Sequence, residues 1–153
     1  MLKFFFRNCK DASSVFFLFF LAYVNLNLLK SDTNTYLMKG PLAGSLYYTA
    51  DKPGRWKDII ESHIPVISKK DHHIEIITNH EMRGFEHYII KHIVFDKEFN
   101  LISEINFDPS RTLAKSTHSI VGYYEKVYVL SICNLHDSWL NVFTLEEDIN
   151  AKP

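Results

Sequence analysis

The stretch Leu101-Ile102-Ser103-Glu104-Ile105-Asn106-Phe107 alternates as a half-buried β-strand does, with Leu101, Ser103, Ile105 and Phe107 on one face. Further β-branched and aromatic runs predict strands at residues 64–67, 74–78, 88–95, 126–132 and 139–143. Turn signals separate the later runs at Asp96-Lys97, Asp108-Pro109-Ser110 and Gly122. No long segment with helical periodicity follows residue 62. We therefore expect an all-β fold, either an antiparallel β-sandwich or a barrel.

Length and charge limit the classes of function. A chain of 153 residues has room for one domain with a single core and an appendage. Its 17 basic residues balance 18 acidic ones, so no basic face is expected and a nucleic-acid partner is excluded. The two cysteines, Cys9 and Cys133, lie in different parts of the chain, which argues against a disulfide framework. Eight histidines in a domain of this size need an explanation.

The first 37 residues form a hydrophobic extension to the expected domain, which spans residues 38–153. Three basic residues precede the ten-residue apolar run of residues 15–24, which is the layout of a signal peptide. Even when extended to residue 29, the run is shorter than the ~20 apolar residues of a spanning helix. A signal, a membrane anchor through residues 15–29 and upstream sequence foreign to the natural protein stay open. We expect an exported or periplasmic location, with a cytoplasmic one if translation starts at Met38.

Five metal-ligand side chains stand at expected strand ends or in loops. Cys133 and His136 form a Cys-x-x-His pair after the strand at 126–132, and three more histidines, His63, His80 and His87, lie upstream. Each of the five alone is more often a core or surface residue than a ligand. Together they indicate one site, because a sandwich brings loops from separate segments to the same end. The remaining histidines, His72, His73, His92 and His118, do not share this placement and receive no role.

The number of donors favours iron over zinc. Structural zinc usually has four ligands in a tetrahedron, and catalytic zinc usually has three protein ligands and a water. Five donors with one sulfur fit neither habit, whereas iron accepts five nitrogen and sulfur ligands and keeps a sixth position open. A thiolate ligand would push electron density onto such an iron, as the cysteine of the haem oxygenases does. Spacing alone does not settle the metal.

Three motifs of the chain resemble those of superoxide reductases, the family of the neelaredoxins and the C-terminal domain of desulfoferrodoxin. The family patterns are Glu-Lys-His-x-Pro, His-Pro-Met-x-x-x-His-Tyr-Ile and Cys-Asn-x-His-Gly-x-Trp. The corresponding segments here, in the same order, are residues 61–65, 80–89 and 133–139. The resemblance spans roughly residues 46–143. The chain lacks the four cysteines of desulfoferrodoxin's additional N-terminal iron domain.

The resemblance implies an enzyme on an immunoglobulin-like antiparallel β-sandwich. It implies a mononuclear Fe2+/Fe3+ site with His63, His80, His87 and His136 about the iron and Cys133 opposite the open position. The reaction would be one-electron reduction of superoxide to hydrogen peroxide, with Glu61 in the place of the glutamate that ligates the resting ferric iron. An external electron donor, rubredoxin-like or another reductant, would be needed. A homo-oligomer is a further expectation.

The chain also departs from the family patterns. Ser62 stands where the family has a lysine whose charge helps to attract superoxide, Glu81 replaces a proline, and Asp137 replaces a glycine. The loop from His80 to His87 is one residue longer than usual. None of these changes removes a ligand. They leave a second hypothesis open, a non-catalytic metal-binding or redox-sensing β-sandwich module.

Overall fold

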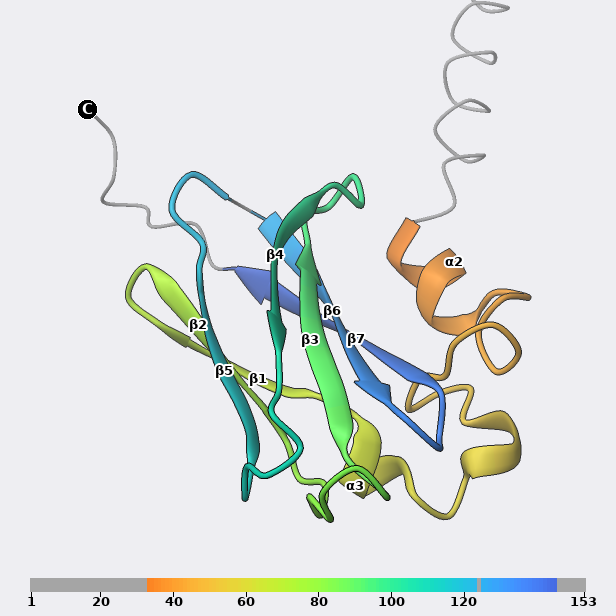
Figure 1. Ribbon diagram of the computed structural model, residues 1–153. Helices are drawn as coiled ribbons and strands as arrows, with labels where there is room; N and C mark the ends of the chain where they lie inside the picture. Colours follow the sequence, from red (N-terminus) through yellow and green to blue (C-terminus); the bar gives the residue numbers. More distant parts are fainter. Residues whose placement is uncertain (1–32, 124, 146–153) are drawn as a thin grey trace, which may run out of the picture. The chain divides into compact units, whose positions relative to one another are not determined.

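A computed structural model of the chain describes residues 33–123 and 125–145 (Figure 1). The expected targeting or anchoring segment at residues 15–29, like Cys9, lies outside these ranges. Within them, no helix combines the length and the apolar character needed to cross a membrane.

Two antiparallel sheets form the fold. The first has the strand order β1-β2-β5, with β1 at Val66–Lys70, β2 at His73–Thr78 and β5 at Ala114–Ser119. The second has the order β4-β3-β6-β7, with β3 at Ile89–Phe95, β4 at Leu101–Asn106, β6 at Glu125–Cys133 and β7 at Ser138–Leu145. The prediction of an all-β antiparallel sandwich is confirmed.

Alternate residues of the strands meet between the sheets. Ile74 and Ile76 of β2 pack against Val94 of β3 and against Val127 and Val129 of β6, and all five are fully buried. The period of two explains this arrangement, because every second side chain of a strand points to the same face. Burying each of these aliphatic side chains contributes about 1.5–3 kcal/mol.

The four-stranded sheet is covered on its other face as well. Tyr128 and Leu140 on that face pack with Met38 of α2 (Thr33–Lys39). The Thr49 hydroxyl donates a 2.8 Å hydrogen bond to the Met38 carbonyl, which holds the connecting segment in place. Because both of its faces are covered, β6 carries the consecutive buried residues 127–129.

Strand β5 is the strand for which the sequence gives no signal. Its inward side chains are Ala114, Ser116 and His118, and its outward ones are exposed. No large aliphatic residue marks its buried face, so the hydrophobic alternation that identifies a strand is absent. The strand is nevertheless paired along its whole length with β2.

A chain of hydrogen-bonded side chains crosses the interior in place of apolar contacts there. The Thr78 hydroxyl lies 2.9 Å from both the Ser131 hydroxyl and His92 Nε2. The Ser116 hydroxyl lies 2.7 Å from His92 Nδ1 and 2.8 Å from His118 Nε2. These hydrogen bonds join β2 and β5 of one sheet to β3 and β6 of the other. They therefore link the two sheets across the core.

One end of the sandwich gathers the segments that carry the candidate ligands. Antiparallel pairing puts the start of β1, the end of β2, the start of β3 and the end of β6 at this end. The short helices before β1, η1 (Gly54–Trp56) and α3 (Ile60–His63), lie there too, and Figure 1 shows α3 beside the loop between β2 and β3. The fold therefore delivers loops from both sheets to one place.

Candidate metal centre

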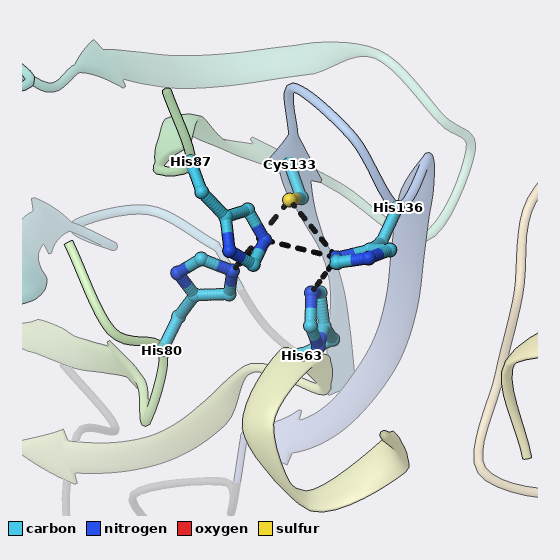
Figure 2. Close-up of side chains that lie close together, drawn as sticks. All are labelled: His63, His80, His87, Cys133 and His136. Carbon is cyan, nitrogen blue, oxygen red and sulfur yellow. Dashed lines mark hydrogen bonds between the residues drawn. The ribbon is translucent and has the colours of Figure 1, made fainter. Parts of the chain in front are cut away.

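The structure brings together the five side chains singled out as ligands, His63, His80, His87, Cys133 and His136. One potential ligand atom from each lies within 4.8 Å of all the others (Figure 2). His63 and His80 belong to segments flanking strands of the three-stranded sheet, and the other three to segments flanking strands of the four-stranded sheet. The cluster thus joins the two sheets at this end.

His63 is positioned by the turn of helix that it ends. Pro65 favours the extended conformation of Ile64, which has ψ 128° and terminates α3. The His63 Nδ1 lies 3.1 Å from the Ile59 carbonyl oxygen and 2.8 Å from the Ser62 hydroxyl. Because a carbonyl oxygen only accepts, Nδ1 carries the ring proton, and the lone pair of Nε2 points into the cluster.

The segment from His80 to His87 is a loop closed on itself. The Arg83 amide donates to the His87 carbonyl at 2.8 Å, and Gly84 supplies the turn with a φ of 60°. Asn134, beside Cys133, holds the loop from the other side. Its side-chain amide donates to the carbonyls of Phe85 and Glu86 at 3.2 Å. The additional residue of this loop leaves both histidines directed at the cluster.

The segment from Cys133 to Asp137 is a tight turn between β6 and β7. The Cys133 amide donates to the Asp137 carbonyl at 2.9 Å, and Asp137 has a left-handed φ of 63°. The Asp137 carboxylate accepts hydrogen bonds from the Arg55 guanidinium at 2.6 Å and from the Trp56 indole at 2.8 Å. The Trp56 ring packs edge-on against the His136 ring. These contacts fix the orientation of His136 from outside the cluster.

The distances between the nitrogens show which coordination geometry the cluster fits. Successive nitrogens, in the order His63 Nε2, His136 Nδ1, His87 Nε2 and His80 Nε2, are each 2.9 Å apart. Ligands at right angles on bonds of about 2.1 Å lie about 3.0 Å apart, whereas tetrahedral ligands lie about 3.4 Å apart. The spacing therefore fits a square or octahedral ion better than a tetrahedral one.

The sulfur lies at nearly equal distances from two of these nitrogens. Cys133 Sγ is 3.6 Å from His80 Nε2 and 3.7 Å from His136 Nδ1, two nitrogens that are not neighbours in the order above. A sulfur nearly equidistant from two opposite corners fits a position over one face of the nitrogens. The donor set thus fits a metal with four imidazoles and one thiolate.

Burial keeps the four imidazoles in the neutral form that binds a cation. It lowers the pKa of both His63 and His80 to about 4, and the neighbouring histidines lower both further. The pKa values of His87 and His136 are also lowered, mainly by burial. These rings are therefore neutral at pH 7, which is the state that binds a metal. Burial raises the pKa of the Cys133 thiol, so a metal must displace its proton.

Glu61 and the other histidines lie outside the cluster. Glu61 is exposed on α3 and lines an open hollow with Lys57 and Ser62. His92 and His118 are buried in the core, whereas His72 and His73 are exposed near the turn between β1 and β2. No local pattern in the sequence marks Trp56 or Arg83, and Asp137 is marked there only by its departure from the family pattern.

Comparisons with solved structures identify the fold. Superoxide reductase (neelaredoxin) from Ignicoccus hospitalis aligns with a TM-score of 0.53 and 20% identity over 67% of this chain and 96% of that chain. A variant of that protein aligns with a TM-score of 0.56 and 19% identity, over 67% and 95%. The chain has the superoxide-reductase fold. Superoxide reductase from Giardia intestinalis aligns with a TM-score of 0.48 and 23% identity, over 56% and 99%.

Comparisons of sequence alone add nothing to this result. No protein-family model matches the chain, and no curated protein matches it. At identities near 20%, the likeness to these solved structures concerns the fold.

Proposed function

We propose that the chain is a non-haem iron superoxide reductase. The observation that carries the proposal is the cluster of four imidazoles and one thiol, with nitrogens at right-angle spacing, at one end of a superoxide-reductase fold. Iron held by these residues would supply one electron to superoxide, which with two protons gives hydrogen peroxide, and an external donor would return the electron.

The protein's own residues have separate tasks in this proposal. His63, His80, His87 and His136 would hold the metal as neutral imidazoles. The hydrogen bond from His63 Nδ1 to the Ile59 carbonyl keeps the His63 ring in the ligating tautomer. Cys133, buried in the core, would bind the metal as a thiolate after losing its proton. We assign Glu61, exposed on α3, the role of a carboxylate ligand of the oxidised resting site.

The first test is the metal content and visible spectrum of the full chain, purified without air and then oxidised. We expect one iron per chain and a thiolate-to-iron charge-transfer band that appears on oxidation. Zinc in place of iron, or iron without this band, would contradict the proposal and identify a metal-binding module.

Substitution of the two cysteines tests the thiolate directly. Cys133→Ser should abolish the band and reduce turnover at least a hundredfold, because a hydroxyl is a far weaker donor at pH 7. Cys9→Ser, outside the described residues, is the matched control and should leave both unchanged. Glu61→Ala should keep much of the reduction rate. Wild-type turnover in Cys133→Ser would refute the role of the thiolate.

The proposal extends to partners and location. It includes an external reductant, rubredoxin-like or other, and a homo-oligomer. It also includes export or membrane anchoring through residues 15–29. If translation starts at Met38, the proposal is instead a cytoplasmic protein. A chain that starts there would lack Leu37, whose carbonyl accepts a 2.9 Å hydrogen bond from the Tyr47 hydroxyl. N-terminal sequencing of the protein from fractionated cells decides between the two starts.

A further inference from the structure

Arg83 places a guanidinium group beside the cluster of five ligand side chains. Its backbone is fixed, because its amide donates to the carbonyl of the ligand His87. Its side chain is 54% exposed, and its Nη2 donates to His87 Nδ1 at 2.9 Å. The arginine is thus anchored at the rim of the cluster and open to solvent on its other side.

The contact between Arg83 and His87 is incompatible with metal binding by His87. A histidine that gives the Nε2 lone pair to a metal keeps its proton on Nδ1. Nδ1 then donates, and a guanidinium has only donors, so the two groups can no longer bond directly. Metal loading therefore releases this arginine donor for an acceptor, and an anion at the cluster supplies one.

A second guanidinium group at this end is already paired with a carboxylate. Arg55 is bound by Asp137 at 2.6 Å. Arg83 has a weaker partner, Glu81, at 3.5 Å, and the Glu81 side chain is 73% exposed and well screened by water. Of these two guanidinium groups, Arg83 therefore retains more of its field at the rim.

The field of Arg83 reaches the cluster itself. Its Nη2 lies 2.9 Å from Nδ1 of His87, one of the four ligand imidazoles. A positive charge this close to a ligand ring attracts an anion to the cluster. Arginine suits this task, because its planar guanidinium is always charged and is less strongly hydrated than an ammonium.

We propose that Arg83 attracts small anions to the metal centre and holds them there, superoxide among them. The proposal rests on the proposed function for the identity of the substrate. The attraction itself concerns any small anion that binds at the metal. Arg83 is in this sense a positioning residue, and Glu81 moderates its charge.

Azide binding to the ferric full-length protein tests the proposal without turnover. Followed by absorbance, azide should bind Arg83→Gln about five- to tenfold more weakly than the wild type, and Arg83→Lys nearly as well. Glu81→Gln should bind azide more tightly. Lys97→Gln is the charge-matched control, because Lys97 follows the far end of β3, about 20 Å from its start. It should bind azide like the wild type.

Pulse radiolysis then measures the bimolecular rate with superoxide as a function of ionic strength. Arg83→Gln should be several-fold slower than the wild type at low salt, and the two rates should converge at high salt, where charges are screened. Equal azide affinities and equal rates in Arg83→Gln and wild type, at equal metal content, would overturn the proposal. So would an Arg83→Lys variant as impaired as Arg83→Gln.

Failure of the proposed function gives a different result. A chain that holds a metal but does not reduce superoxide refutes the reductase, while its azide affinity still decides the role of Arg83. A chain that holds no metal overturns both.

Discussion

Asp137 links the cluster of five ligand side chains to the segment before α3. Its carboxylate receives the Arg55 and Trp56 hydrogen bonds, and these residues lie 82 and 81 positions away in the chain. The hydrogen bond from the Arg55 guanidinium lowers the pKa of this carboxyl, which therefore stays ionised at neutral pH. Trp56, held by it, packs against His136. One carboxylate thus sets the orientation of a ligand that it does not touch through its side chain.

Replacing Asp137 should weaken metal binding more than it weakens the fold. We expect Asp137→Ala to lower metal affinity about tenfold, as loss of a supporting contact to a ligand does. The free energy of unfolding of the metal-free protein should fall by about 1 kcal/mol, since the ion pair is half exposed. Competition with a chelator measures the first quantity and urea denaturation the second.

The matched control for this prediction is Glu104→Ala. Glu104 also forms a half-exposed ion pair, with Lys91 at 3.2 Å, but on the strands β3 and β4. Its removal should leave the metal affinity unchanged. Equal losses of affinity in the two variants would show that Asp137 acts only through net charge.

The sequence predicts the five donors but not the residues around them. His63, His80, His87, Cys133 and His136 stand in short motifs at strand ends, where residue type and spacing carry information. Asp137, by contrast, appears in the sequence only as a non-glycine residue in a turn. Its partners lie more than eighty positions upstream, and no local pattern connects them.

Ser116 holds the interior of β5 together. Its hydroxyl lies between two buried rings, 2.7 Å from His92 Nδ1 and 2.8 Å from His118 Nε2. Ser116→Ala should reduce the free energy of unfolding by about 1–3 kcal/mol, because two buried nitrogens lose a partner. Thr117→Ala, on the exposed face of the same strand, should cost less than about 0.5 kcal/mol. Urea titrations of both variants check this, and equal costs would refute it.

The same polar interior explains why no hydrophobic alternation in the sequence predicts β5. β2 and β6 present Ile74, Ile76, Val127 and Val129 to the core, and their runs are recognised as strands. β5 presents an alanine, a serine and a histidine, whose burial depends on partners in other strands. Its place in the sheet is decided by pairing with β2 and by hydrogen bonds across the sandwich.

We expect the folded protein to lose stability in acid, because the buried His92 ring resists protonation. Burial lowers the pKa of His92 to about 3, against 6.5 in an exposed imidazole. Below pH 6.5 the unfolded chain takes up a proton that the folded state refuses. The stability contributed by the neutral ring is complete above pH 6.5 and is lost as the pH falls towards 3. The slope for this residue approaches about 1.4 kcal/mol per pH unit.

The variant His92→Gln isolates this contribution. It should be less stable than the wild type at pH 7, where the neutral ring contributes fully. Its free energy of unfolding should fall less than that of the wild type between pH 7 and pH 5. Denaturation of both proteins at each pH, without metal, gives the comparison, and parallel pH profiles would contradict the prediction.

The distribution of the ligands along the chain has a consequence for biosynthesis. His63 and His136 meet at 2.9 Å although 73 positions separate them. A ribosome must therefore translate through β6 and its turn before the last two donors, Cys133 and His136, exist. No shorter nascent fragment contains the complete donor set. The complete site can form only late in synthesis, when β6 has been made and can pair with β3 in the sheet that orders the ligand loops.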